Sequence, residues 1–109
     1  MAFGLFFTQD DNFGGNIELF LDKEFYTKKM AESAFNEQLS ILANHEKCNE
    51  FQPTKISKDV FHFYVKMENG TEQKRGFFIS RVYKTEKYSL RTVSDARQKA
   101  LKFNLISNF

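Results

Sequence analysis

The sequence predicts a single-domain α+β fold, in which an antiparallel sheet of four or five strands packs against two helices. Three observations lead to this fold class. Alternating apolar runs, typical of strands, occur in two groups, and a stretch with helical periodicity follows each group. The order is therefore ββα followed by ββ(β)α, without the strand–helix alternation of a parallel sheet. The chain has 109 residues, which is enough for one core, so we expect residues 1–109 to form one domain.

The first half, residues 1–52, should begin with a hairpin. Residues 3–7 form an apolar run that ends in a polar, glycine-containing stretch at 8–16. Residues 17–21 alternate, which places Ile17, Leu19 and Leu21 on one face of a second strand. Asp22 or Thr27 can then cap a helix that runs to about residue 45.

The second half, residues 53–109, should repeat this order after a polar boundary at residues 46–58. Two alternating runs, 60–67 and 74–83, flank Asn69-Gly70, which is a strong signal for a two-residue hairpin turn. A further run at 88–91 could add a third strand. Thr92 and Asp95 then have the spacing of a helix cap, and the helix should bury a stripe. That stripe comprises Val93, Ala96, Ala100 and Phe103.

A two-residue turn at Asn69-Gly70 determines the strand register and predicts a binding surface. It pairs Phe61 with Phe78 and leaves basic and aromatic side chains together on the outward face. Such a face suits nucleic acid, because cations meet phosphates and rings stack on bases. The predicted contact residues are Tyr64, Lys66, Arg75, Phe77, Arg81, Tyr83 and, from the following segment, Arg91.

The charges are divided unevenly along the chain. Residues 1–52 have four lysines and nine acidic residues, whereas residues 53–109 have twelve basic and five acidic residues. The net charges are thus −5 and +7, and all four arginines lie in the second half. This asymmetry indicates an anionic partner for the basic half, unless the two halves fold together and neutralise each other.

Residues 59–104 resemble the AP2-type DNA-binding domain, which also occurs at the N-termini of phage integrases. The resemblance depends on antiparallel strands that end in Tyr88-Ser-Leu-Arg-Thr-Val-Ser-Asp-Ala-Arg-Gln-Lys-Ala-Leu. It implies a three-stranded sheet whose arginines and aromatic residues enter the major groove, with a helix bracing the sheet from behind. Arg75, Arg81 and Arg91 would then be the groove-facing residues.

No motif indicates catalysis, a metal or a cofactor, and we expect none of the three. A zinc site needs three or four converging ligands, and the chain has only one cysteine, Cys48. Together with His45 and His62, it disfavours a complete zinc site on ligand number alone, so we expect no metal. Glu46 and Glu50 would raise the pKa of the Cys48 thiol, which disfavours a nucleophile. We therefore interpret the chain as a non-catalytic binding protein.

The partner can belong to one of two classes. The first is nucleic acid or a nucleoprotein complex, bound through the basic aromatic face. The second is a host protein, because the motif-free composition, rich in Lys, Asn and Phe, resembles small phage and mobile-element proteins, including anti-CRISPR-type inhibitors. We expect a cytoplasmic protein without a membrane partner, and residues 3–7, if they form an edge strand, could pair two copies through the N-terminal hairpin.

Overall fold

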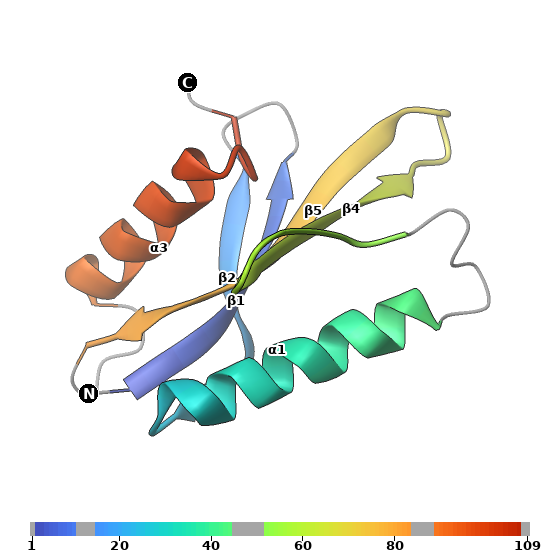
Figure 1. Ribbon diagram of the computed structural model, residues 1–109. Helices are drawn as coiled ribbons and strands as arrows, with labels where there is room; N and C mark the ends of the chain where they lie inside the picture. Colours follow the sequence, from blue (N-terminus) through green and yellow to red (C-terminus); the bar gives the residue numbers. More distant parts are fainter. Residues whose placement is uncertain (1, 11–14, 45–51, 84–88, 108–109) are drawn as a thin grey trace.

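Five antiparallel strands form one sheet, and each face of the sheet carries one helix (Figure 1). The computed structural model describes residues 2–10, 15–44, 52–83 and 89–107. The fold class, the two helices and the order of strands and helices are confirmed. The strands are β1 (Ala2–Asp10), β2 (Asn16–Phe25), β3 (Thr54–Ser57), β4 (Val60–Lys66) and β5 (Glu72–Val82), and the helices are α1 (Lys28–Ala43) and α3 (Leu90–Lys102).

The sheet order is β2-β1-β5-β4-β3, so the two halves of the chain share one sheet. β1 from the acidic half pairs with β5 from the basic half along its whole length, from Ala2–Val82 to Asp10–Lys74. β1 also pairs with β2, as expected for the hairpin, and therefore has a neighbour on each side. The expectation that residues 3–7 lie at a sheet edge is wrong, because β2 is the edge strand.

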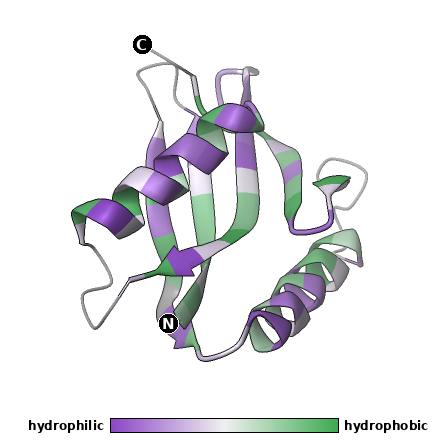
Figure 2. Cartoon of the chain, turned by 60° about the vertical axis from the view of Figure 1, so that its left-hand side comes forward, coloured by the Kyte–Doolittle hydropathy of each residue, from purple (hydrophilic) through white to green (hydrophobic). Residues whose placement is uncertain are grey.

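Two apolar layers, one on each face of the sheet, form the core. Phe6, Phe78 and Val82 pack against Ala96 and Ala100 of α3. On the other face, residues including Leu5, Phe61 and Phe77 pack against Ala31 and Phe35 of α1. The central strands are therefore apolar on both sides, which Figure 2 shows as green bands along them.

Helix α1 begins where the sequence indicates. Thr27 is its N-cap, and the Thr27 hydroxyl accepts a hydrogen bond from Met30 N at 3.2 Å. The buried residues Ala31 and Phe35 lie one turn apart, and the Phe35 ring contacts Phe61 edge-on at 5.1 Å between centroids. Because β2 and β3 lie at opposite edges, α1 is part of the connection that crosses the sheet.

Helix α3 begins earlier than expected. Its N-cap is Ser89, whose hydroxyl accepts from Thr92 N at 3.3 Å, so Thr92 is not the cap. Leu90 and Arg91 are helical and do not form a third C-terminal strand, and Tyr88 lies outside the described residues. The third strand of this half is β3, which lies in the stretch expected to be a linker. Ala96 and Ala100 are buried as expected, whereas Val93 is 43% exposed and Thr92 is buried in its place.

Neither helix described by the structure combines the length and the apolar character that crossing a bilayer requires.

Candidate functional site

The hairpin between β4 and β5 turns through three residues and not two. Met67 N donates to Thr71 O at 2.7 Å, and Gly70 N donates to Met67 O at 2.9 Å. Gly70 has a φ of +87°, whereas Asn69 is not among the positive-φ residues. The loop is therefore a type I turn followed by a left-handed glycine, and the Asn69 side chain accepts from Thr71 N at 3.0 Å.

This turn shifts the predicted register by one residue. Phe61 lies opposite Phe77, and Val60 lies opposite Phe78, where the two-residue turn would have paired Phe61 with Phe78. A one-residue shift moves every side chain of one strand to the other face relative to its partner. The predicted outward face, on which tyrosines of β4 and arginines of β5 lie together, is therefore wrong.

Four predicted contact residues are separated by this shift. Tyr64 and Lys66 lie on the α3 side of the sheet, whereas Arg75 and Phe77 lie on the α1 side. Arg75 Nε donates to Gln73 Oε1 on its own strand at 3.2 Å. Phe77 is only 5% exposed and stacks on Phe61 within the core, which removes it from any contact surface.

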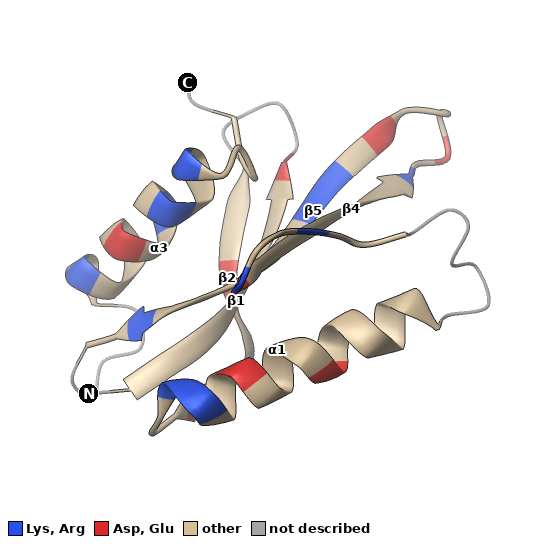
Figure 3. Ribbon diagram, in the orientation of Figure 1, with Lys and Arg blue, Asp and Glu red and all other residues tan. Residues whose placement is uncertain are grey.

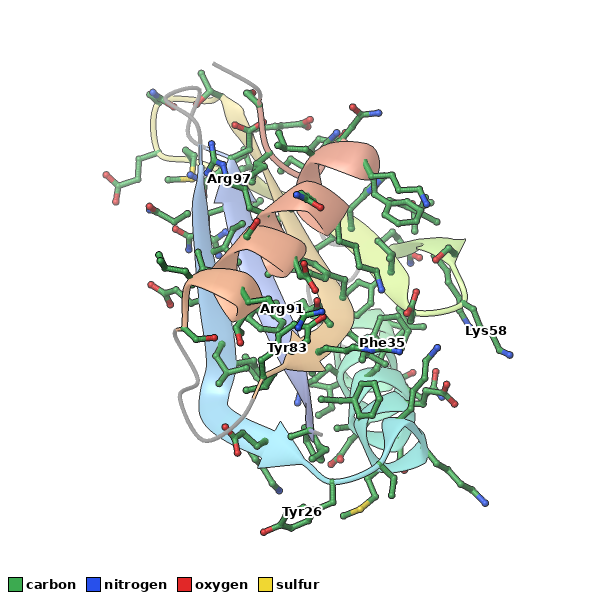
Figure 4. All side chains as sticks on the ribbon, turned by 90° about the vertical axis from the view of Figure 1, so that its left-hand side faces the viewer. Tyr26, Phe35, Lys58, Tyr83, Arg91 and Arg97 are labelled. Carbon is green, nitrogen blue, oxygen red and sulfur yellow. The ribbon has the colours of Figure 1, made fainter. Side chains whose placement is uncertain are left out.

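The other three predicted residues come together where β5 leads into α3. The Arg91 guanidinium lies 4.1 Å from the centroid of the Tyr83 ring, and Figure 4 shows the two side chains beside each other below α3. The Tyr83 hydroxyl donates to the Asp95 carboxylate. Arg91 belongs to the first turn of α3 and not to a strand, so it does not lie on the sheet surface where the AP2 resemblance would place it.

A cleft of about 670 Å³ opens beside Arg81 and Tyr83. It lies where β4 is missing: β4 begins at Val60, opposite Phe78, so residues 79–82 of β5 have a strand neighbour, β1, on one side only. We call this the β5–α3 cleft. Its main lining residues are Phe3 and Arg81 from the sheet, Tyr83 directly after β5, Lys99 and Lys102 from α3, and Lys28 from α1.

Both carboxylates of the cleft are already engaged. Lys99 Nζ lies 2.7 Å from Asp59 Oδ2, and Asp95 accepts from Tyr83. By contrast, within the described ranges no carboxylate lies in ion-pair distance of Lys28, Arg81 or Lys102. The cleft therefore has an excess of positive charge, and Figure 3 shows basic residues at the start of α1, at the end of β5 and along α3.

His62 lies outside this cleft, on the face of β4 that also presents Tyr64. The two rings meet edge-on at 5.5 Å between centroids. Burial, together with the positive charge of Lys74, lowers the pKa of His62, and its buried Nδ1 has no hydrogen-bond partner among the described residues. Nothing that the structure describes groups three metal-binding side chains, and His45 and Cys48 lie outside the described residues.

A second groove of about 410 Å³ runs between β2 and α1. Apolar side chains, including Phe20, Phe25 and Met30, dominate its lining. Tyr26, which is 84% exposed, precedes α1 at this end of the molecule (Figure 4). The groove lacks the excess of cations that distinguishes the β5–α3 cleft.

Three lysines of the cleft were not among the residues predicted from the sequence. Lys99 and Lys102 follow Asp95 at four and seven residues along a helix, a spacing that places all three along one side of α3. This spacing is a signal from which a charged side of the C-terminal helix could have been predicted. Lys28 carries no such signal, because only the packing of α1 brings it near β5.

No protein-family model, curated protein or solved structure matches the chain. The function must therefore be argued from the geometry and charge of the site.

Proposed function

We propose that this chain is a non-catalytic binding protein that docks onto an anionic partner through the β5–α3 cleft. One observation carries the proposal. Lys28, Arg81 and Lys102 line the same cleft, and no carboxylate lies within ion-pair distance of these cations among the residues that the structure describes. Cations gathered along a concave surface attract anionic groups and raise the rate at which such partners associate.

The remaining groups of the cleft support binding and not proton transfer. Asp59 is held by Lys99, and Asp95 is held by Tyr83, so each carboxylate has a fixed structural partner. The Tyr83 main-chain N–H donates to Thr92 Oγ1 at 2.9 Å, which ties the end of β5 to the first turn of α3. These bonds fix Asp59, Asp95 and the end of β5 in place beside the other cations of the cleft.

The geometry favours a protein partner over nucleic acid. The predicted stacking platform needed an open aromatic sheet face, but α1 and α3 each cover one face. Near the cleft, Arg91 already lies over one face of the Tyr83 ring, where a base would otherwise stack. This favours the second class considered from the sequence, an inhibitor or adaptor that binds another protein.

Two double variants with the same change in charge test the proposal. Arg81→Glu with Lys102→Glu reverses the charge of the cleft, whereas Lys66→Glu with Arg75→Glu reverses it on the β4–β5 hairpin. Binding of fluorescent polyglutamate and of single-stranded oligothymidylate is measured over a salt series. We expect the cleft variant to lose about tenfold or more in affinity and the hairpin variant to change little. The opposite ranking would contradict the proposal.

A further inference from the structure

Residues 79–82 of β5 have a main-chain edge that none of the described strands covers. Ile79 N donates to Asp59 O at 3.2 Å, and Ile79 O accepts from Lys99 Nζ at 2.6 Å. Both main-chain groups of Ile79 therefore point to the β4 side of β5. Every second residue of an antiparallel strand points its N–H and C=O the same way, so those of Arg81 also point to this side.

Arg81 is the unpaired position along this edge. Ile79 before it is bonded as described, and Tyr83 after it donates its N–H to Thr92 Oγ1. Arg81 is exposed, and no group among the described residues bonds to its main chain on the open side. An unpaired N–H and C=O at a sheet edge form a template on which another strand can pair.

The β5–α3 cleft provides the space for such a strand. It lies in line with β4, which begins only at Val60 because the chain arrives from β3 through a turn at residues 58–59. Side chains of an added strand would alternate between the two sides of the sheet. Those on one side would meet Lys28 and the Arg81 side chain, and those on the other would meet Lys102 of α3.

We propose that the cleft takes an extended acidic segment of a partner protein, which pairs with the main chain of Arg81 as a short strand in line with β4. The inference rests on the proposed function and specifies the partner. The charge of Lys28, Arg81 and Lys102 complements acidic side chains. A peptide also supplies both an acceptor for the Arg81 N–H and a donor for its C=O, whereas a phosphodiester backbone supplies only acceptors.

The test uses a capped synthetic peptide of alternating glutamate and valine as the probe. Two control peptides have the same charge, one with methyl groups on the amide nitrogens of the glutamates and the other on those of the valines. Alternate residues of a strand point their N–H groups in opposite directions. Pairing along one edge therefore uses either the N–H groups of the glutamates or those of the valines, but not both. We expect one control peptide to bind about three- to tenfold more weakly than the unmethylated probe, and the other to bind nearly as well as the probe.

Amide hydrogen exchange of the intact protein gives an independent measurement. We expect the probe peptide to slow exchange at Arg81 by about tenfold or more and to leave the already paired Ile79 nearly unchanged. Arg81→Gln removes the guanidinium but keeps the main chain. In that variant, exchange at position 81 should still slow when enough peptide is added.

Three results would overturn the inference. If both methylated peptides bind equally well and position 81 remains unprotected, strand pairing is wrong, although the cleft still binds anions. If oligothymidylate binds the cleft more tightly than the peptide, the partner is nucleic acid. If no polyanion binds, the proposed function fails as well.

Discussion

Lys99 joins three parts of the molecule through a single ammonium group. From α3 it reaches Asp59, next to the start of β4, and the main-chain oxygen of Ile79 in β5. Its side chain is 24% exposed and that of Asp59 is 18% exposed, so water screens the pair only in part. Lys99 thus fixes α3 beside the open part of β5 and forms one wall of the cleft.

Replacing Lys99 by methionine should therefore destabilise the fold. Lys99→Met keeps most of the apolar stem but leaves Asp59 and the Ile79 carbonyl without their donor. We expect the free energy of unfolding, measured by urea denaturation, to fall by about 1.5–3 kcal/mol, because hydrogen bonds to charged groups contribute about that much. Lys102→Met is the matched control, since Lys102 has no carboxylate in ion-pair distance among the described residues, and it should change stability little. Equal stabilities of the two variants would refute this role of Lys99.

At the scale of an element, the β4–β5 hairpin determines which side chains lie together. Asn-Gly predicts a two-residue turn, yet a three-residue turn also requires a left-handed residue, and Gly70 supplies it. The dipeptide therefore indicates where the chain reverses without determining the loop length. The hydrogen bonds from Thr71 to the Asn69 side chain favour the longer loop, and they depend on contacts that the strand pattern does not contain.

Substitutions at two glycines test this hairpin. A Cβ at Gly70 would meet nothing within 4 Å, so Gly70→Ala should cost only the left-handed strain, about 1 kcal/mol, and Gly70→Asn less. Gly76→Ala should cost more, because its Cβ would lie 2.8 Å from Leu105 Cδ2 and 2.8 Å from Thr8 Oγ1. Thermal unfolding would rank the variants. A Gly70→Ala protein as stable as the wild type would argue against the left-handed conformation of Gly70 in this turn.

In strand β5, the alternation of apolar and polar residues did not predict which face of the sheet is exposed. Phe77, Phe78 and Ile79 are consecutive and all buried, because α1 covers one face and α3 the other. A continuous apolar run is what a strand buried on both faces requires. The run was present in the sequence, and so was a similar one at Leu5-Phe6-Phe7 in β1. These two apolar runs indicated that helices would cover both faces of the sheet, so that neither face would be exposed to bind a ligand.

At the scale of the whole molecule, the fold class followed from patterns that are local in sequence. Thr27 as a cap, the Ala96 and Ala100 stripe and the N-terminal hairpin were all predictable, because they depend on residues close together in the chain. The pairing of β1 with β5 was not, since it joins residues about seventy positions apart.

That long-range pairing also creates the candidate site. It keeps residues 79–82 in the sheet past the point where β4 begins, and the packing of α1 brings Lys28 near Arg81. Arg81 and Tyr83 were predicted as contact residues and both line the cleft, whereas Arg91, predicted with them, lies over the Tyr83 ring. The charges of the two halves do not cancel there, because none of the described acidic residues of the first half lies among the residues that line the cleft.

The most direct test of the β5–α3 cleft is a map of amide chemical shifts while polyglutamate is added to the labelled protein. The account predicts that the largest changes occur at Arg81, Tyr83 and the α3 residues Lys99 and Lys102, and that they disappear at high salt. Changes centred instead on Tyr64 and the β4–β5 hairpin, with the cleft unaffected, would contradict it.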